Sequence, residues 1–270
     1  MKKCLSFYNY KGGTGKTALN ILSSLELERR GFKVLLVDAD GQANATTFLY
    51  DTDGTEKTII DALIYNLKIE DTIIKSPLES YPNLDLIPGG MNIVQLESLI
   101  ASKTAKEKVF LRWFTKNLDA IKEYDYIIFD LSPTPGLINQ NILIALDSII
   151  TVAEYDDLSS LRGIEDFIAK YNDDIEILEL PNAKMVSIIN KYKESQSNSK
   201  DIFNNCLPSF ENTYSIMLDT KIHESVAIKT AILYRQSIHD YSKQNKSSGN
   251  SRANKEIISL IDELERKELL

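Results

Sequence analysis

A glycine-rich run, YKGGTGKT at residues 10–17, lies between an apolar segment at residues 5–8 and a helical pattern at residues 19–30. Strand, glycine loop and helix in this order form a phosphate-binding loop, in which backbone N–H groups converge on phosphate oxygens. Lys16 would reach the β- and γ-phosphates, and the Thr17 hydroxyl would bind Mg²⁺. The strict pattern G-x-x-x-x-G-K-[ST] is not met, because Tyr10 stands in place of its first glycine and Lys11 follows it.

Strand-like apolar runs alternate with helical patterns along the chain. Strands are expected at residues 5–8, 34–37, 84–88, 126–129, 148–152 and 185–189, and helices at 19–30, 94–101, 107–121, 160–171 and 201–205. Apolar runs without alternation suit parallel strands that are covered on both faces. We therefore predict an α/β fold, a doubly wound and mostly parallel sheet with helices on both faces, of the P-loop NTPase class.

Polar side chains follow the ends of several of these strands. Asp40, Asp130 and Asn190 come just after strand ends, as does the loop that carries Lys16. Ligands of doubly wound sheets bind outside the carboxyl ends of the strands, so one site can collect all four residues. A carboxylate beside a triphosphate can position the attacking water or a Mg²⁺-bound water. Either role is open to Asp40, and Asp130 would hold Mg²⁺, usually through water.

Composition limits the cellular setting. The chain has 270 residues, a net charge of −8, 43% hydrophobic and 26% charged residues, as expected for a globular protein with a large core. Cys4 and Cys206 lack metal-ligand spacing and suit a reducing cytoplasm. No signal peptide and no apolar stretch as long as a membrane span is found.

Several motifs resemble those of the ParA/MinD group of deviant Walker A ATPases, most of all its ParA-type DNA-partitioning branch. They are NYKGGTGKT at 9–17, DADGQANAT at 38–46, FDLSP at 129–133, ALDS at 145–148, LRG at 161–163 and TKIHES at 220–225. The resemblance covers nearly the whole chain, and it implies a single ATPase domain over residues 1–270. The chain departs from the family pattern at Gly41, where proline is common, at Thr151 and Ala153, and at His223.

The resemblance implies ATP and Mg²⁺ as cofactors and a role for each matching residue. Lys11 would cross an ATP-bound homodimer to the partner's phosphates, and Asp40 would orient the hydrolytic water, so Lys11, Lys16 and Asp40 are the catalytic residues. Mg²⁺ would be bound by Thr17, by Asp130 through water and, as a second candidate, by Asp40 through water. The nucleotide-binding residues are Lys11, Gly12, Gly13, Thr14, Gly15, Lys16, Thr17, Ala18 and Asn190, with Asn190 at the adenine base. Hydrolysis tied to dimerisation would be slow and stimulated by partner and DNA.

The segment 191–255 is the basic part of this acidic chain, because Lys and Arg outnumber Asp and Glu in it by ten to six. ParA-type dimers bind double-stranded DNA without sequence preference through basic residues near the C-terminus, and phosphate contact needs no base readout. The candidate DNA-binding residues are Lys191, Lys193, Lys221, Lys229, Arg235, Lys243, Lys246 and Arg252. Residues 242–252 are polar and rich in breakers, and they predict a mobile surface loop.

The resemblance also implies a separate centromere-binding partition protein, which would supply sequence specificity and stimulate hydrolysis. No helix-turn-helix precedes the phosphate-binding loop, so we expect no sequence-specific operator binding by this chain. The expected location is cytoplasmic and nucleoid-associated, and the expected cargo is plasmid or chromosome DNA.

Other members of the same fold group remain as alternatives. A MinD-like membrane-cycling ATPase would need a C-terminal amphipathic helix with a basic face, whereas the helix expected at 255–270 is mostly acidic, so no membrane partner is expected. A nitrogenase-reductase-like electron carrier would need cysteines near the nucleotide-site strands. A tyrosine-kinase relative would carry a terminal tyrosine cluster, and no tyrosine lies beyond Tyr241. A non-enzymatic binding module would not need Lys16, Thr17, Asp40 and Asp130 together.

Overall fold

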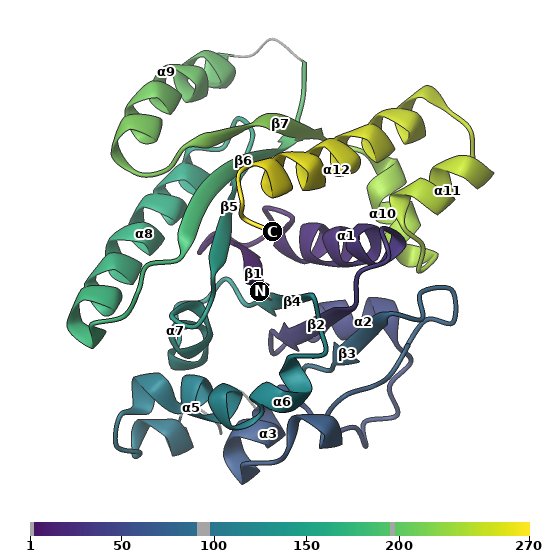
Figure 1. The fold of residues 1–270 in the computed structure, drawn as a ribbon. Coiled ribbons are helices and arrows are strands. Elements are labelled where there is room, and N and C mark those ends of the chain that lie inside the picture. The colour runs from purple at the N-terminus through teal and green to yellow at the C-terminus, as the bar shows by residue number, and fades with distance from the viewer. Residues whose placement is uncertain (1–2, 91–97, 195–197) are drawn as a thin grey trace.

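Seven parallel strands form the centre of the structure (Figure 1). The computed structural model describes residues 3–90, 98–194 and 198–270. In spatial order the strands are β3 (Leu84–Ile87), β2 (Val34–Ala39), β4 (Tyr126–Leu131), β1 (Lys3–Tyr8), β5 (Ser148–Glu154), β6 (Lys184–Tyr192) and β7 (Met217–His223). All neighbouring pairs are parallel. The predicted doubly wound sheet is thereby confirmed.

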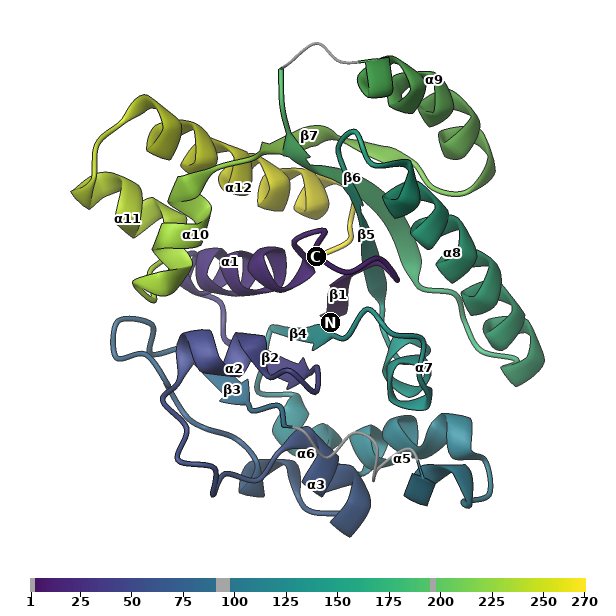
Figure 2. The same ribbon diagram turned by 180° about the vertical axis from the view of Figure 1, so that it is seen from behind.

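Helices cover both faces of this sheet (Figures 1 and 2). One face carries α1 (Lys16–Arg29), α2 (Asn44–Leu49), α10 (Val226–Leu233), α11 (Ile238–Gln244) and α12 (Ser248–Arg266). The other face carries α3 (Ile59–Tyr65), α5 (Val109–Lys116), α6 (Leu118–Ile121), α7 (Leu137–Leu143), α8 (Leu158–Leu178) and α9 (Asn198–Thr213), with single 3₁₀ turns at Ile69–Asp71 and Lys106–Lys108.

The strands supply side chains alternately to two hydrophobic cores. In β1, Leu5 and Phe7 pack with α1 and α12, whereas Cys4 and Tyr8 pack on the side of α7 and α8. All four side chains are buried. Each fully buried side chain of this size contributes on the order of 1.5–3 kcal/mol. Burial on both faces explains why the sequence shows continuous apolar runs in the central strands.

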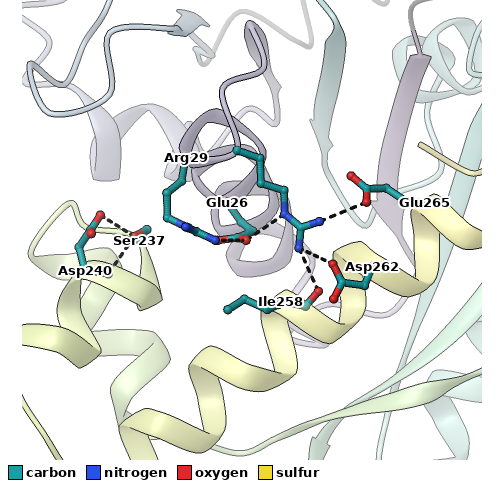
Figure 3. A network of polar contacts seen from close by, with 8 residues as sticks. Glu26, Arg29, Ser237, Asp240, Ile258, Asp262 and Glu265 are labelled. Carbon is teal, nitrogen blue, oxygen red and sulfur yellow. Dashed lines mark hydrogen bonds and ion pairs between the residues drawn. The ribbon is translucent and has the colours of Figure 1, made fainter.

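A network of polar contacts holds the C-terminal helix α12 against α1, the helix that follows the phosphate-binding loop (Figure 3). Glu26 of α1 is buried and accepts hydrogen bonds from Arg29 at 2.7 and 2.8 Å and from Arg30 at 3.0 Å. The Arg30 guanidinium also contacts Asp262 at 2.7 Å and Glu265 at 3.2 Å on α12. Arg30 therefore joins the C-terminal end of α1 to α12.

The prediction of a mobile loop at residues 242–252 is wrong. Residues up to Gln244 belong to α11, and α12 begins at Ser248, seven residues before the expected start at 255. Ser247 caps α12, because its hydroxyl accepts a hydrogen bond from the Asn250 N–H at 3.1 Å. Serine disfavours a helix interior but stabilises a helix N-terminus, so a serine-rich segment resembles a loop in sequence.

The helix expected at 107–121 is divided in two, since Asn117 separates α5 from α6. Asn117 accepts a hydrogen bond from the Ile69 N–H at 2.9 Å, so it serves a tertiary contact at that point. The helix expected at 94–101 is described only from residue 98 on, where the chain is helical; its first four residues lie outside the described residues. Within the described part of the chain, no helix is sufficiently long and apolar to cross a bilayer.

Candidate nucleotide-binding site

The glycine-rich loop joins the central strand β1 to the N-terminus of α1. Gly13 and Gly15 have φ values of +82° and +97°, a region that side chains other than glycine rarely adopt. The first residue of α1 is Lys16, and no side chain caps the helix at Gly15. The first N–H groups of a helix carry partial positive charge and lack partners within the helix, so this end is a ready anion-binding site.

Lys16 is turned into the loop and buried, with 6% of its surface exposed. Its Nζ donates a hydrogen bond to the Lys11 carbonyl at 2.8 Å. Burial lowers the pKa of Lys16 to about 8, against the opposing effect of the Asp130 and Asp40 carboxylates. Lys11 itself is exposed at the rim of the loop. The two lysines therefore differ in environment, since Lys16 is buried and Lys11 is exposed.

Asp130 and Thr17 form the part of the site that suits a metal ion. Asp130 is fully buried at the end of β4, and its Oδ1 accepts a hydrogen bond from Asn20 at 2.8 Å. Burial and the nearby Asp38 charge raise the pKa of Asp130 to about 7, while Asn20 and the Thr17 hydroxyl favour its charged form. The other carboxylate oxygen, Oδ2, has no hydrogen-bond partner among the described residues.

These two residues fit Mg²⁺. The ion is usually held by one or two carboxylates together with substrate phosphates and waters. Among the described residues, no group of three His, Cys, Asp or Glu side chains could hold a metal without such help. An unpartnered carboxylate oxygen of Asp130 near the Thr17 hydroxyl is therefore the donor set that a nucleotide-bound Mg²⁺ requires.

Asp38 organises the loop that carries Asp40. Its carboxylate accepts hydrogen bonds from the Asp40 N–H at 3.1 Å and from the N–H and hydroxyl of Thr46, both at 2.8 Å. Burial raises the pKa of Asp38 to about 6 despite these donors. Gly89 packs so closely that a Cβ there would lie 2.8 Å from the Asp38 carboxylate. The sequence motif contained Asp38, but its supporting role depends on contacts that only the fold brings together.

A depression of about 360 Å³ is lined by many of the predicted phosphate-binding residues and by Asp40, but not by Lys11, Thr14 or Asp130. Lys16, Thr17, Ala18 and Asp40 line it together with three loop glycines. Two stretches of chain contribute residues that sequence reasoning did not select, namely Gln42 and Asn44 after Asp40, and Leu131 and Pro133 after β4. Thr14 is buried behind the loop, and its hydroxyl has no hydrogen-bond partner among the described residues.

Asn190 contacts the phosphate-binding loop. At the end of β6 it is buried, and its Nδ2 donates a hydrogen bond to the Thr14 carbonyl at 2.7 Å. It does not line the depression. In this structure Asn190 therefore supports the loop from behind, and an adenine contact stays a prediction.

The candidate DNA-binding residues lie in different surroundings. Four of them pair with carboxylates: Lys191 with Glu154 at 3.0 Å, Lys193 with Glu224 at 2.7 Å, Arg252 with Glu256 at 3.8 Å, and Arg235 with Asp51. Lys221 lies over the Tyr192 ring, 5.1 Å from its centroid, and Lys229 is exposed.

Lys243 and Lys246 form a more open basic group. Together with four serines they line a shallow depression where α11 leads into α12. The candidates therefore do not form one uniform patch. Of the two lysines, Lys243 has an acidic neighbour in Asp240, which lies one turn earlier in α11.

Comparisons with known proteins identify the family and the fold of this chain. The family profile AAA_31, described as an AAA domain, matches residues 2–178. The cell division protein PomZ of Myxococcus xanthus is 36% identical over 160 residues, which make up 59% of this chain and 48% of PomZ. The virulence plasmid ParA family protein pGP5-D of Chlamydia psittaci is 29% identical over 270 residues, or 98% of this chain and 95% of that protein. An ATP complex of a McdA variant from Cyanothece superposes with a TM-score of 0.79 at 20% identity, covering 98% and 96% of the two chains, and this likeness shows the fold.

Proposed function

The chain belongs to the ParA/MinD family as a ParA-type partitioning ATPase, and on this premise we propose that it hydrolyses ATP slowly in an ATP-dependent homodimer that binds DNA. ATP and Mg²⁺ are the cofactors of this site. The observation that carries the proposal is the contrast between the two loop lysines. Lys16 is buried and lines the depression, whereas Lys11 is exposed and does not line it.

Within one subunit, the loop N–H groups and Lys16 bind the phosphates. Mg²⁺, when bound, neutralises developing charge on the phosphate oxygens. Thr17 and Asp130 would hold the ion, Asp130 through water. Asp40 lies on the wall of the depression and orients the attacking water, while Asp38 fixes the backbone of Asp40.

Lys11 supplies the dependence on a second subunit. An exposed ammonium at the rim is placed to meet the phosphates bound by a partner chain, and charge at that point stabilises the transition state. Turnover is then slow in the monomer and requires the dimer. ATP acts as a timer, because the dimer lasts until hydrolysis and the ADP form is monomeric.

DNA binding is assigned to the basic segment, with Lys243 and Lys246 as the leading contacts. The carboxylates that face Lys191, Lys193, Arg235 and Arg252 reduce their attraction for phosphate. Lys243 and Lys246 instead adjoin the N-terminus of α12, where helix N–H groups and serine hydroxyls also favour phosphate. Two copies in a dimer double this surface.

Sequence specificity would come from a centromere-binding partner that also stimulates hydrolysis. The cargo is plasmid or chromosome DNA, and the expected place is the cytoplasm, on the nucleoid. A relative whose name supports a DNA cargo is the chromosome partitioning protein ParA of Caulobacter vibrioides, with 30% identity over 148 residues, or 54% of each chain.

The test measures binding of the purified protein to non-specific duplex DNA with ATP, ADP or no nucleotide, across a salt series, with anionic vesicles in parallel. We expect ATP-dependent binding that weakens steeply with salt, and no vesicle binding. Vesicle binding without DNA binding would replace this proposal by the MinD-like membrane alternative.

A pair of lysine variants locates the DNA contact. Lys243→Ala with Lys246→Ala should weaken DNA binding and lower the slope of log affinity against log salt by about two. Lys122→Ala is the matched control, since Lys122 is an exposed lysine at the end of α6 outside the basic segment. Equal loss in both variants would mean that only the overall charge of the protein matters.

A further inference from the structure

Asn9, directly before the glycine-rich loop, uses its whole side-chain amide to hold the chain in place. Its Nδ2 donates to the Val152 carbonyl of β5 at 2.8 Å and to the Ser160 carbonyl of α8 at 2.9 Å. Its Oδ1 accepts a hydrogen bond from the Lys11 N–H at 2.8 Å. Asn9 is fully buried. The main chain at Lys11 is thereby tied to two elements that are distant in sequence.

Gly163, in the second turn of α8, packs against the same atoms. A Cβ at this position would lie 2.5 Å from Asn9 Oδ1, 3.2 Å from the Lys11 nitrogen and 3.4 Å from Lys11 Cβ. The first distance is shorter than any ordinary contact, so a side chain at 163 would displace the Asn9 amide or the Lys11 backbone. Its φ is outside the left-handed region, so what Gly163 supplies is space.

Two more contacts complete the arrangement. The Tyr10 ring packs edge-on against Phe167 of α8, with the centroids 5.6 Å apart. The Lys11 carbonyl accepts the hydrogen bond from Lys16 at 2.8 Å. The Lys11 main chain is thus held at its nitrogen by Asn9 and at its oxygen by Lys16, while the residue remains exposed.

We infer that Asn9 and Gly163 are positioning residues for Lys11. In this proposal α8 supports the Lys11 backbone, so that the lysine side chain can reach a second subunit. The inference rests on the proposed function, in which Lys11 reaches the partner's phosphates. A flexible four-carbon side chain can reach across an interface only from a fixed backbone, because each free backbone torsion adds to the entropy lost on contact. The deviant loop sequence, with Tyr10 in place of glycine, is consistent with a backbone fixed against α8.

Gly163→Ala tests the inference, with Gly249→Ala as the matched control. Gly249 is also helical, in α12, and a Cβ there would meet no atom within 4 Å. For Gly163→Ala we expect MgATP binding close to that of the parent, measured with a fluorescent ATP analogue, and a kcat lower by roughly 10–100-fold. Gly249→Ala should leave both unchanged. A Gly163→Ala protein with parental kcat would overturn the inference.

A double-mutant cycle with Lys11→Ala separates positioning from general damage. The readout is the dissociation constant of the ATP-dependent dimer, measured by sedimentation in the Asp40→Ala background so that ATP persists. If Gly163 acts through Lys11, then Gly163→Ala weakens the dimer when Lys11 is present and adds nothing once Lys11 is alanine. Additive effects would show that Gly163 acts elsewhere, and the inference would be wrong.

Asn9→Asp provides a second route should Gly163→Ala fold poorly. Aspartate keeps an acceptor for the Lys11 N–H but loses both donors to Val152 and Ser160. We therefore expect the same loss of kcat, and no further change in the dimer dissociation constant when Lys11 is already alanine. Parental turnover in Asn9→Asp would refute the inference as well. A parent protein that neither dimerises with ATP nor loses turnover in Lys11→Ala would instead refute the proposed function.

Discussion

Asn190 and Thr14, which are 176 residues apart, are joined by a hydrogen bond of 2.7 Å from the Asn190 amide to the Thr14 carbonyl. The contact ties the end of β6 to the middle of the phosphate-binding loop. It also explains why residue 15 is glycine, since a Cβ there would lie 2.1 Å from Asn190 Nδ2. The fold thus supports the loop from a strand that lies two positions from β1 in the sheet.

Asn190→Ala should loosen the loop and weaken binding of every phosphate ligand. Loss of one buried hydrogen bond predicts an affinity for MgATP lower by about 5–30-fold, or about 1–2 kcal/mol. Competition binding with ATP and with tripolyphosphate checks this, because tripolyphosphate has no base. Equal losses for both ligands indicate a role in the loop, whereas a loss confined to ATP would support the adenine contact predicted from sequence. Asn205→Ala, at an exposed position of α9, is the control.

Asp40→Ala should separate binding from turnover. The Asp40 carboxylate is placed on the wall of the depression, and its substitution leaves the loop N–H groups and Lys16 intact. We expect MgATP binding and an ATP-dependent dimer with kcat lower by about 100-fold or more. Binding is followed by equilibrium fluorescence and turnover by phosphate release. Loss of nucleotide binding in this variant would assign Asp40 to structure.

Asp38→Ala should lower the stability of the protein more than Asp40→Ala does. Three donors, the Asp40 N–H and the N–H and hydroxyl of Thr46, would lose their buried acceptor. We expect the free energy of unfolding to fall by about 2–4 kcal/mol, measured by urea denaturation, whereas Asp40→Ala should change it little. Equal stability of the two variants would show that Asp38 does not organise this loop.

Much of the fold could be predicted from sequence because central parallel strands are buried on both faces. The apolar runs at 34–37 and 126–129 correspond to β2 and β4. The glycine-rich loop indicated the strand before it, β1, and the helix after it, α1. β7 was missed, since it is an edge strand whose pattern MLDTKIH buries only Leu218 and Ile222. An edge strand with polar residues facing water carries no continuous apolar signal.

The chemistry-bearing residues of the site were found because they occur in local motifs. The residues that hold them in place were not predicted, because each acts through contacts between segments that are far apart in the sequence. Asn9 reaches Ser160, and Asp38 lies against Gly89, through pairings that no local pattern encodes. The position of Asn190 behind the loop could be learned only from the way β6 ends beside β5.

Arg30→Ala should weaken the attachment of α12 to α1. Arg30 is the residue that contacts Glu26, Asp262 and Glu265 together, and its side chain is 18% exposed. Breaking a largely buried group of this kind predicts a loss of about 2–4 kcal/mol in unfolding free energy. Amide hydrogen exchange should rise in α12 more than in α8. Arg29→Ala is the comparison, because Arg29 forms its ion pair with Glu26 alone among the described residues. An equal loss of unfolding free energy in both variants would mean that the contact with Glu26, and not the bridge to α12, provides the stability.

Glu263 gives α12 a second, pH-dependent attachment. This buried carboxylate accepts hydrogen bonds from the N–H groups of Asp219 and Thr220 in β7, both at 2.9 Å. Burial alone would raise the pKa of Glu263, but the two backbone donors and the Thr220 hydroxyl outweigh it and hold the pKa below its usual value. The folded-state pKa is thus below the unfolded-state pKa, so this stabilisation is complete above about pH 4.3 and is lost as the pH falls through the folded-state pKa.

Glu263→Gln should therefore destabilise the protein at pH 7 and much less in acid. The amide can replace one acceptor but presents N–H groups to the other backbone donor, which predicts a loss of about 1–3 kcal/mol at pH 7. Urea unfolding of parent and variant at pH 7 and near pH 3.5 measures the difference, which should shrink at the lower pH as the parent carboxylate protonates. Glu268→Gln is the control, since Glu268 pairs with Lys184 on the exposed surface and should matter little. A pH-independent difference for Glu263→Gln would mean that packing, and not the charge, holds this end of α12 to β7.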